Sequence, residues 1–136
     1  MKSCVYVAIL ASTALTGCVL SVTEENAAGL TAQQLCYAAA VSAAGNSAPI
    51  NKVKALAELE RREYLTRSDV RQMLQNIYVQ PGMSERAAVC MWGGTYDAVN
   101  VTQTARGVRK QYVSRSDYRS TYYFYTESGV VTAVQY

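Results

Sequence analysis

Four cysteines, at positions 4, 18, 36 and 90, are the side chains of this sequence best suited to covalent chemistry. The 136 residues contain no histidine. Without imidazole, the chain cannot use Ser-His or Cys-His nucleophiles, histidine-ligated metals or histidine pH switches. Acylation, disulfide formation and direct thiol reactivity are the chemistry that remains for the four thiols.

Carboxylates and serines add little that could support catalysis. Glu58, Glu60 and Glu63 lie close in sequence, but Arg61-Arg62 interleaves with them, which indicates a solvated helix face. Two carboxylates divide acid and base roles only where their environments separate the two pKa values. Ser84 has no activating base beside it, so we interpret it as a helix N-cap. The sequence therefore predicts a protein without enzymatic activity, cofactor or metal.

The first residues have the pattern of an export signal. Met1-Lys2-Ser3 supplies a positive start, and the apolar run that follows, from Cys4 to Leu15, is too short to span a membrane. Leu15-Thr16-Gly17-Cys18 resembles the lipobox of bacterial lipoproteins, in which the cysteine is acylated and becomes the first mature residue. Residues 1–17 are therefore predicted to be a lipoprotein signal peptide, with lipid on Cys18. Ordinary signal cleavage, with Cys18 as a bystander, is the alternative.

The residues after Cys18 predict where the protein resides. Val19, rather than Asp, follows the cysteine, and by resemblance to lipoprotein sorting signals this favours the periplasmic face of the outer membrane. Residues 18–29 show no periodic apolar pattern, so we expect a lipidated tether averaging roughly 17 to 20 Å in length. Residues 30–136 are predicted to form a single domain, with a helical part over 30–76.

Cys36 and Cys90 are the only thiols left once the signal is removed and Cys18 is acylated. Exported proteins meet an oxidising environment, so we predict a disulfide between them. It would close a loop of 55 residues (90 − 36 + 1), worth about 4 kcal/mol of stability in the chain-entropy model. A reactive thiol and a pair of buried free thiols are the competing interpretations.

Capping signals and apolar spacing predict four helices. Thr31 and Thr66 begin capping patterns, an amphipathic helix is expected after Pro49, and Ser84 caps a last short helix. Trp92, at the end of that helix, is expected in the core. The apolar residues expected to face the core are Ile50, Val53, Leu56, Ala57 and Leu59 in the second helix and Val70, Met73, Leu74 and Ile77 in the third.

After Tyr96 the hydrophobic period changes to two, which favours strands over residues 99–104, 108–113, 121–126 and 130–136. In the last strand, strict alternation would place Val131 and Val134 on opposite faces. Helices followed by strands indicate an α+β fold in two layers, in which helices pack on one face of a short antiparallel β-meander of three or four strands.

A set of glycine, aromatic and apolar residues punctuates residues 77–136: Gly82-Met83-Ser84, Val89, Trp92-Gly93, Val99-Asn100, Gln111-Tyr112, Tyr123-Phe124-Tyr125 and Gly129-Val130-Val131. This set resembles the BamE (SmpA/OmlA) family of small bacterial envelope lipoproteins. The layout is also similar to that of the beta-lactamase inhibitor proteins. The resemblance implies a module that pairs helices with a short β-meander and serves as a scaffold for protein binding.

Tyrosines and arginines interleave along the predicted sheet. If helices cover one face, the apolar Phe124 belongs inside and Tyr123 and Tyr125 point outward. Tyr and Arg are enriched at binding hot spots, so these two tyrosines form our predicted partner-binding set together with the nearby arginines. Alternatively, the tyrosines are core residues, and the arginines line a solvated face or bind anionic lipid or glycan. The arginines of the set are Arg109, Arg115 and Arg119.

The formal charge of +3 is too small and too evenly spread to indicate nucleic-acid binding. We therefore expect a non-catalytic outer-membrane lipoprotein, anchored through Cys18 and facing the periplasm, that binds or stabilises another component of the cell envelope. The alternative is a periplasmic enzyme inhibitor of the beta-lactamase or lysozyme inhibitor kind.

Overall fold

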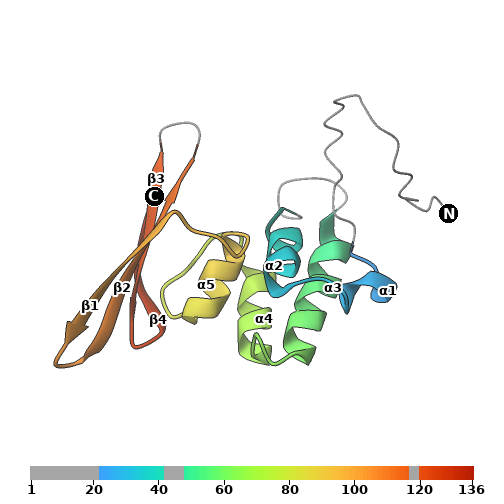
Figure 1. Ribbon diagram of the computed structural model, residues 1–136, viewed down its shortest axis with the longest axis horizontal. Coiled ribbons are helices and arrows are strands. Elements are labelled where there is room, and N and C mark those ends of the chain that lie inside the picture. Colours follow the sequence, from blue (N-terminus) through green and yellow to red (C-terminus); the bar gives the residue numbers. More distant parts are fainter. Residues whose placement is uncertain (1–21, 42–47, 117–119) are drawn as a thin grey trace, which may run out of the picture.

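The computed structural model describes residues 22–41, 48–116 and 120–136. Within these ranges helices precede strands, and the strands form one antiparallel sheet in the order β1-β2-β3-β4 (Figure 1). The predicted α+β fold with a β-meander is confirmed. The signal peptide, Cys18 and Arg119 lie outside the described residues. The elements are α1 Glu24–Ala27, α2 Ala32–Val41, α3 Ala48–Arg61, α4 Arg67–Gln75, α5 Glu85–Met91, β1 Ala98–Thr104, β2 Gly107–Arg115, β3 Thr121–Glu127 and β4 Val130–Gln135.

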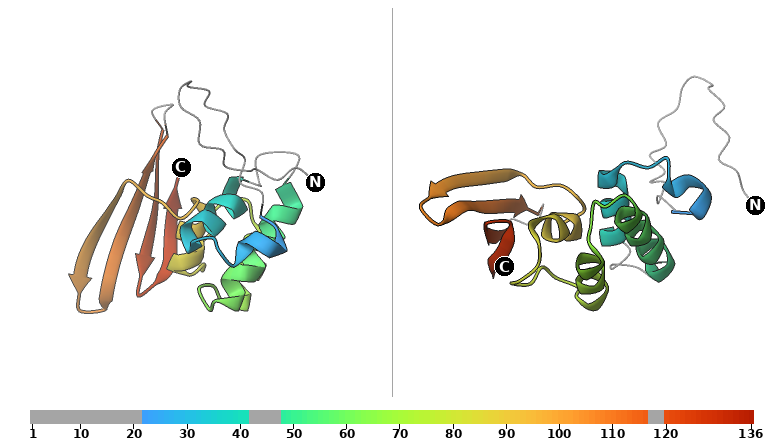
Figure 2. Two further views of the ribbon diagram at one scale, coloured as in Figure 1. Left: turned by 45° about the vertical axis from the view of Figure 1, so that its right-hand side comes forward. Right: turned by 90° about the horizontal axis from the view of Figure 1, so that it is seen from below.

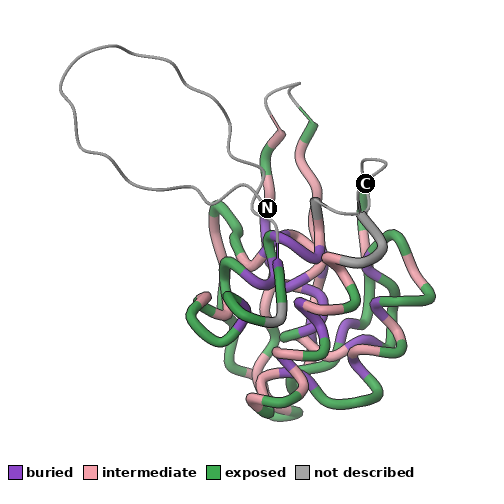
Figure 3. Tube along the Cα trace, turned by 90° about the vertical axis from the view of Figure 1, so that its right-hand side faces the viewer, coloured by how far each residue is buried: buried purple, intermediate pink, exposed green. Residues whose placement is uncertain are grey.

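α5 is the helix that lies against the sheet, and α2, α3 and α4 lie on its far side (Figures 1 and 2). Two hydrophobic cores result, one among the helices and one between α5 and the sheet. Ala87 and Cys90 of α5 belong to the first core, and Ala88 belongs to the second. Buried segments run through the interior of the helical part, with exposed residues around them (Figure 3). α5 therefore fixes the helical part relative to the sheet.

Three of the four predicted helix starts are confirmed, whereas α3 begins at Ala48 and not after Pro49. The backbone N–H of Gln34 donates to Thr31 Oγ1 at 3.1 Å, and Thr31 N–H donates to Gln34 Oε1 at 2.8 Å. Thr66 forms the same reciprocal pair with the residue three positions later. Ser84 Oγ accepts a hydrogen bond from the third residue of α5 at 3.1 Å. These side chains satisfy N–H groups that a helix start otherwise leaves free.

The predicted disulfide is present between Cys36 of α2 and Cys90 of α5, and both cysteines are buried. Their Cα atoms lie 4.8 Å apart. The chain just after α5 approaches α2 closely at Gly94. A Cβ at this position would lie 3.2 Å from the Cβ of Cys36, and the φ of +77° also favours glycine. The disulfide and this close contact together hold α5 to the helical part.

The buried face of α3 differs from the predicted stripe. Val53 is 51% exposed and Ala57 is also exposed, whereas Ala55, Leu56 and Leu59 are buried. α2 presents buried alanines to α3 as well. Small side chains on both helices let the backbones approach, and this contact sets the rotation of α3. Ile50 lies outside the residues whose side chains are described.

The stripe predicted for α4 holds for only two of its four residues. Met73 is buried and Val70 packs against the same core, but Leu74 is 48% exposed and Ile77 is 71% exposed. α4 ends before Asn76, whose φ of −122° and ψ of 144° are extended. Ile77 lies beyond the helix, so the helical period no longer determines its direction.

The predicted boundary of the tether, 18–29, is wrong at its C-terminal end. Val22 is buried, and residues 24–27 form the single-turn helix α1. The guanidinium of Arg62 closes the end of α1, since a cation satisfies the free carbonyls at a helix C-terminus. One buried valine gives no periodic signal, which is why the sequence did not reveal the contact. The acceptors are the carbonyl oxygens of Leu30, Ala27 and Ala28, at 2.6, 2.8 and 3.1 Å.

A β-bulge breaks the predicted alternation of β4. Tyr125 and Thr126 are consecutive on β3, but their partners on β4, Ala133 and Val131, are two residues apart. One residue of β4 is therefore extra, and the side chains beyond it change face. As a result Val131 and Val134 both pack on the core that α5 shares with the sheet.

Candidate binding surfaces

The face of the sheet turned away from α5, here called the outer face, carries Tyr123 and Tyr125. Both are half-buried, whereas Phe124 between them is fully buried beneath α5. The predicted directions of these three side chains are therefore confirmed. No helix or strand among the described residues lies over the outer face (Figures 1 and 2). The cross-strand partners are Val113 and Gln135 for Tyr123, and Gln111 and Ala133 for Tyr125.

Hydrogen bonds from both neighbouring strands hold the phenol of Tyr125 in place. Gln111 Nε2 donates to its hydroxyl at 3.0 Å, and the hydroxyl donates to Gln135 Oε1 at 3.4 Å. Asn100 Nδ2 extends this chain by donating to Gln111 Oε1 at 2.8 Å. A side chain fixed before binding loses less conformational entropy when a partner arrives.

Two of the three predicted arginines share the outer face with the tyrosines. Arg109 and Arg115 both lie on β2, six residues apart, which corresponds to about 20 Å along a strand. Arg109 Nε lies 3.4 Å from a carboxylate oxygen of Glu127, and both side chains reach solvent. The structure thus brings four of the five predicted partner-binding residues onto one surface.

Glu85 connects α5 to the opposite, inner face of the sheet. One carboxylate oxygen accepts hydrogen bonds from Lys110 Nζ at 2.6 Å and the hydroxyl of Tyr112 at 2.8 Å. The other accepts from Thr126 Oγ1 at 3.0 Å. Sequence reasoning placed Glu85 only in the first turn of a helix, because its three partners lie on two distant strands.

These contacts shift the pKa of Glu85 and the pKa of Tyr112. Burial alone would raise the pKa of Glu85, but the hydrogen bonds from Lys110, Tyr112 and Thr126 outweigh burial and lower it. Burial and the adjacent carboxylate of Glu85 raise the pKa of Tyr112. Glu85 is therefore ionised at neutral pH and saturated with donors, which suits a structural role rather than proton transfer.

The glutamates of α3 are paired with arginines. Glu58 accepts from Arg61 Nε at 2.8 Å and from Arg62 Nε at 2.7 Å, and these bonds lower its pKa to about 2. Glu60 lies 3.3 Å from Arg67 Nε. A carboxylate that remains ionised in this way cannot serve as a general acid near neutral pH.

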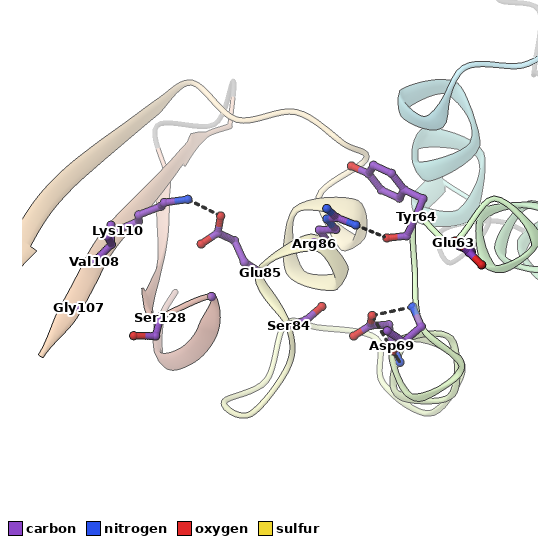
Figure 4. A pocket seen from close by; sticks show the side chains of 12 residues that line it. Glu63, Tyr64, Asp69, Ser84, Glu85, Arg86, Gly107, Val108, Lys110 and Ser128 are labelled. Atoms are coloured by element: carbon purple, nitrogen blue, oxygen red, sulfur yellow. Dashed lines mark hydrogen bonds and ion pairs between the residues drawn. The ribbon is translucent and has the colours of Figure 1, made fainter.

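An open cleft of about 700 Å³ separates the helical part from the sheet (Figure 4). Lys110 and Glu85 point toward one another at its sheet side. On the helical side, Arg86 Nη1 donates to the backbone carbonyl oxygen of Tyr64 at 3.4 Å. The guanidinium carbon of Arg86 also lies 5.6 Å from the centre of the Tyr64 ring. Because these contacts join α5 to its neighbours on both sides, we assign the cleft a structural role.

A second concavity, of about 420 Å³, is lined by aromatic side chains that the sequence did not bring together. We call it the aromatic groove. Its rings come from α2, the segment before α5, the end of α5, β3 and the residue after β4. The sequence contains no local signal for this groove, because its rings lie in separate segments of the chain. The aromatic groove is formed mainly by Tyr37, Tyr78, Met91, Trp92, Tyr122 and Tyr136.

Trp92, expected in the core, is half-buried: its ring packs on Phe124 at 4.6 Å between centroids, and it also lines the aromatic groove. Among the described residues there is no group of three or more cysteine, aspartate or glutamate side chains that could hold a metal ion. No helix in the same ranges is long and apolar enough to cross a membrane.

Comparison with known proteins gives no relative. No protein-family model matches this chain, and neither does any curated protein or solved structure. The resemblance to the BamE family remains a prediction from the residue pattern over 77–136.

Proposed function

We propose that this protein is a non-catalytic lipoprotein of the bacterial outer membrane that faces the periplasm and binds another component of the cell envelope. The observation that carries the proposal is the outer face of the sheet. There Tyr123 and Tyr125 lie side by side between Arg109 and Arg115, and no described element covers them.

The chemistry of the outer face fits a protein partner. Tyrosine and arginine are enriched at the centres of protein interfaces, where rings supply area and guanidinium groups supply directed hydrogen bonds. The fixed phenol of Tyr125 adds a preorganised contact. The Arg109–Glu127 pair at the rim would contribute to recognition and association rate more than to affinity.

The disulfide supports the exported part of the proposal, because such bonds persist in oxidising compartments. The packing of Val22 would also make the membrane anchor short. If Cys18 is acylated, only residues 19–21 separate it from Val22, a span of at most about 14 Å. The domain would then lie close to the lipid headgroups, within reach of membrane-embedded partners.

Site-specific photocrosslinking in the native host tests the proposal. A photoreactive amino acid at Arg109, on the outer face, should capture a defined envelope protein in the membrane fraction. Arg71 is exposed on α4 and gives a matched control position that should capture little. Equal capture at both positions would contradict binding through the outer face, and capture of a soluble hydrolase at Arg109 would favour the inhibitor alternative.

A further inference from the structure

The aromatic groove keeps several rings in contact with solvent. Tyr37, Tyr78 and Tyr136 are 55%, 63% and 61% exposed. The Tyr136 ring meets those of Tyr78 and Tyr122 edge-on, with centroids 5.7 and 6.0 Å apart. The rings therefore pack on one another without filling the concavity. Its volume falls in the range of small-molecule binding sites.

The groove is fixed on the fold at several points. Trp92 is held by its edge-on contact with Phe124 in the core. The hydroxyl of Tyr136 donates to the carbonyl oxygen of Val79 at 3.0 Å. Gly93 lies against Tyr37, and a Cβ at this glycine would be 3.5 Å from that ring. A ligand would thus meet a surface whose arrangement already exists.

The groove offers several free hydrogen-bond donors. The hydroxyls of Tyr37, Tyr78 and Tyr122 and the indole N–H of Trp92 bond no protein group in the described part of the chain. A phenol or an indole N–H pairs readily with a carbonyl acceptor while its ring packs on an apolar surface.

The absence of charge in this lining further limits the class of ligand that could bind. Among the described residues that line the groove, no side chain carries a formal charge at neutral pH, and none is a carboxylate, guanidinium or amide. Anionic headgroups would require cations, and sugars would favour planar groups that bond two adjacent hydroxyls. The lining instead suits an uncharged ligand with apolar rings and unpaired carbonyl acceptors.

We propose that the aromatic groove binds a proline-rich segment of another protein in the polyproline II conformation. Pyrrolidine rings pack well on aromatic side chains, and this helix leaves its carbonyl oxygens free of internal hydrogen bonds. The segment is extended before binding, so little entropy is lost. This surface is separate from the outer face, and the inference does not depend on the function proposed for that face.

Trp92 provides a direct readout, because it is the single tryptophan of the chain. Decaproline should be titrated into the purified protein while Trp92 fluorescence is followed. A saturable change in emission is expected, and a glycine-serine peptide of equal length should produce none. An oligosaccharide of N-acetylglucosamine tests the competing ligand class.

Variants of the groove give the second part of the test. Tyr78→Ala and Tyr37→Ala should each weaken decaproline binding by about fivefold or more. Tyr78→Phe keeps the ring but removes a donor, and should cost about threefold. Tyr125→Ser on the outer face is the matched control and should change affinity by less than about twofold. Thermal unfolding confirms that each variant is folded.

The inference would be overturned by no saturable response to decaproline, by an equal response to the glycine-serine peptide, or by a response to the oligosaccharide alone. Unchanged decaproline affinity in a folded Tyr37→Ala/Tyr78→Ala variant would place the peptide elsewhere and overturn it as well.

Discussion

The two faces of the sheet carry aromatic residues in alternation, yet they differ in what surrounds the rings. On the inner face Tyr112 and Phe124 stack at 4.6 Å between centroids, beneath α5 and beside the ionised Glu85. On the outer face Tyr123 and Tyr125 are bordered by amide and arginine side chains and by no described helix. Residues of similar type thus pack in the core on one face and stay partly exposed on the other.

This difference arises from one short helix. α5 is joined to α2 by a disulfide and to the strands by the carboxylate of Glu85, so it covers one face only. The alternation of the strands sets the two groups of rings apart, and the position of α5 decides which group becomes core. Mutations should therefore separate stability from binding.

Phe124→Ala should produce the largest loss of stability, about 3 to 5 kcal/mol, because it leaves a cavity in the core between α5 and the sheet. Urea unfolding with far-UV circular dichroism measures the loss. Tyr125→Ala, one residue away on the outer face, is the matched control and should cost far less. Similar losses in both variants would contradict the distinction between the faces.

The disulfide should have the next largest effect, since it holds α5 over the inner face. Cys36→Ala/Cys90→Ala should lower the free energy of unfolding by up to about 4 kcal/mol. Mass spectrometry of the non-reduced protein should first show the two cysteine peptides joined. Reductant should destabilise the original protein and leave the alanine variant unchanged, and labelling of both thiols in the native protein would refute the bond.

Glu85→Gln tests the polar link between α5 and the sheet, and should cost about 1.5 to 3 kcal/mol at neutral pH because charged hydrogen bonds are lost. The pKa of Glu85 is lowered in the fold, so its contribution is fully present above the unfolded pKa of about 4.3 and is lost as pH falls through the lower folded value. Unfolding measured from pH 7 to pH 3 should show a shallower acid loss in the variant. If the variant and the original protein lost the same amount of stability as the pH falls, this would argue against the role of Glu85.

Removing the outer tyrosines should have the smallest effect on stability. Tyr123→Ser and Tyr125→Ser should each cost about 1 kcal/mol or less, the size of a cross-strand contact on an open sheet face. Urea unfolding provides the measurement. A loss close to that of Phe124→Ala would mean that the outer face belongs to the core.

Most of the features that could be predicted from the sequence are local ones. Thr31, Thr66 and Ser84 bond N–H groups within one helical turn, so their capping roles follow from spacing. The disulfide followed from elimination of the other two cysteines. The direction of Tyr123 and Tyr125 followed from strand alternation around a purely apolar Phe124.

Apart from the disulfide, features that depend on distant contacts could not be predicted. The rotation of α3 is set by close packing with α2, which exposes Val53. The bulge in β4 depends on its pairing with β3, and the contacts of Glu85 depend on where α5 meets the sheet. The aromatic groove was not predicted for the same reason, because Tyr37 and Tyr136 are 99 residues apart (136 − 37).

The most direct test of the central claim is partner capture with the Tyr123→Ser/Tyr125→Ser variant. Envelope crosslinking of the original protein should recover a specific partner, which is identified by mass spectrometry. The double variant should remain folded and membrane-associated but lose that partner, whereas the groove variant Tyr78→Ala should retain it. A folded double variant that still recovers every partner in full would contradict the outer face as the binding surface.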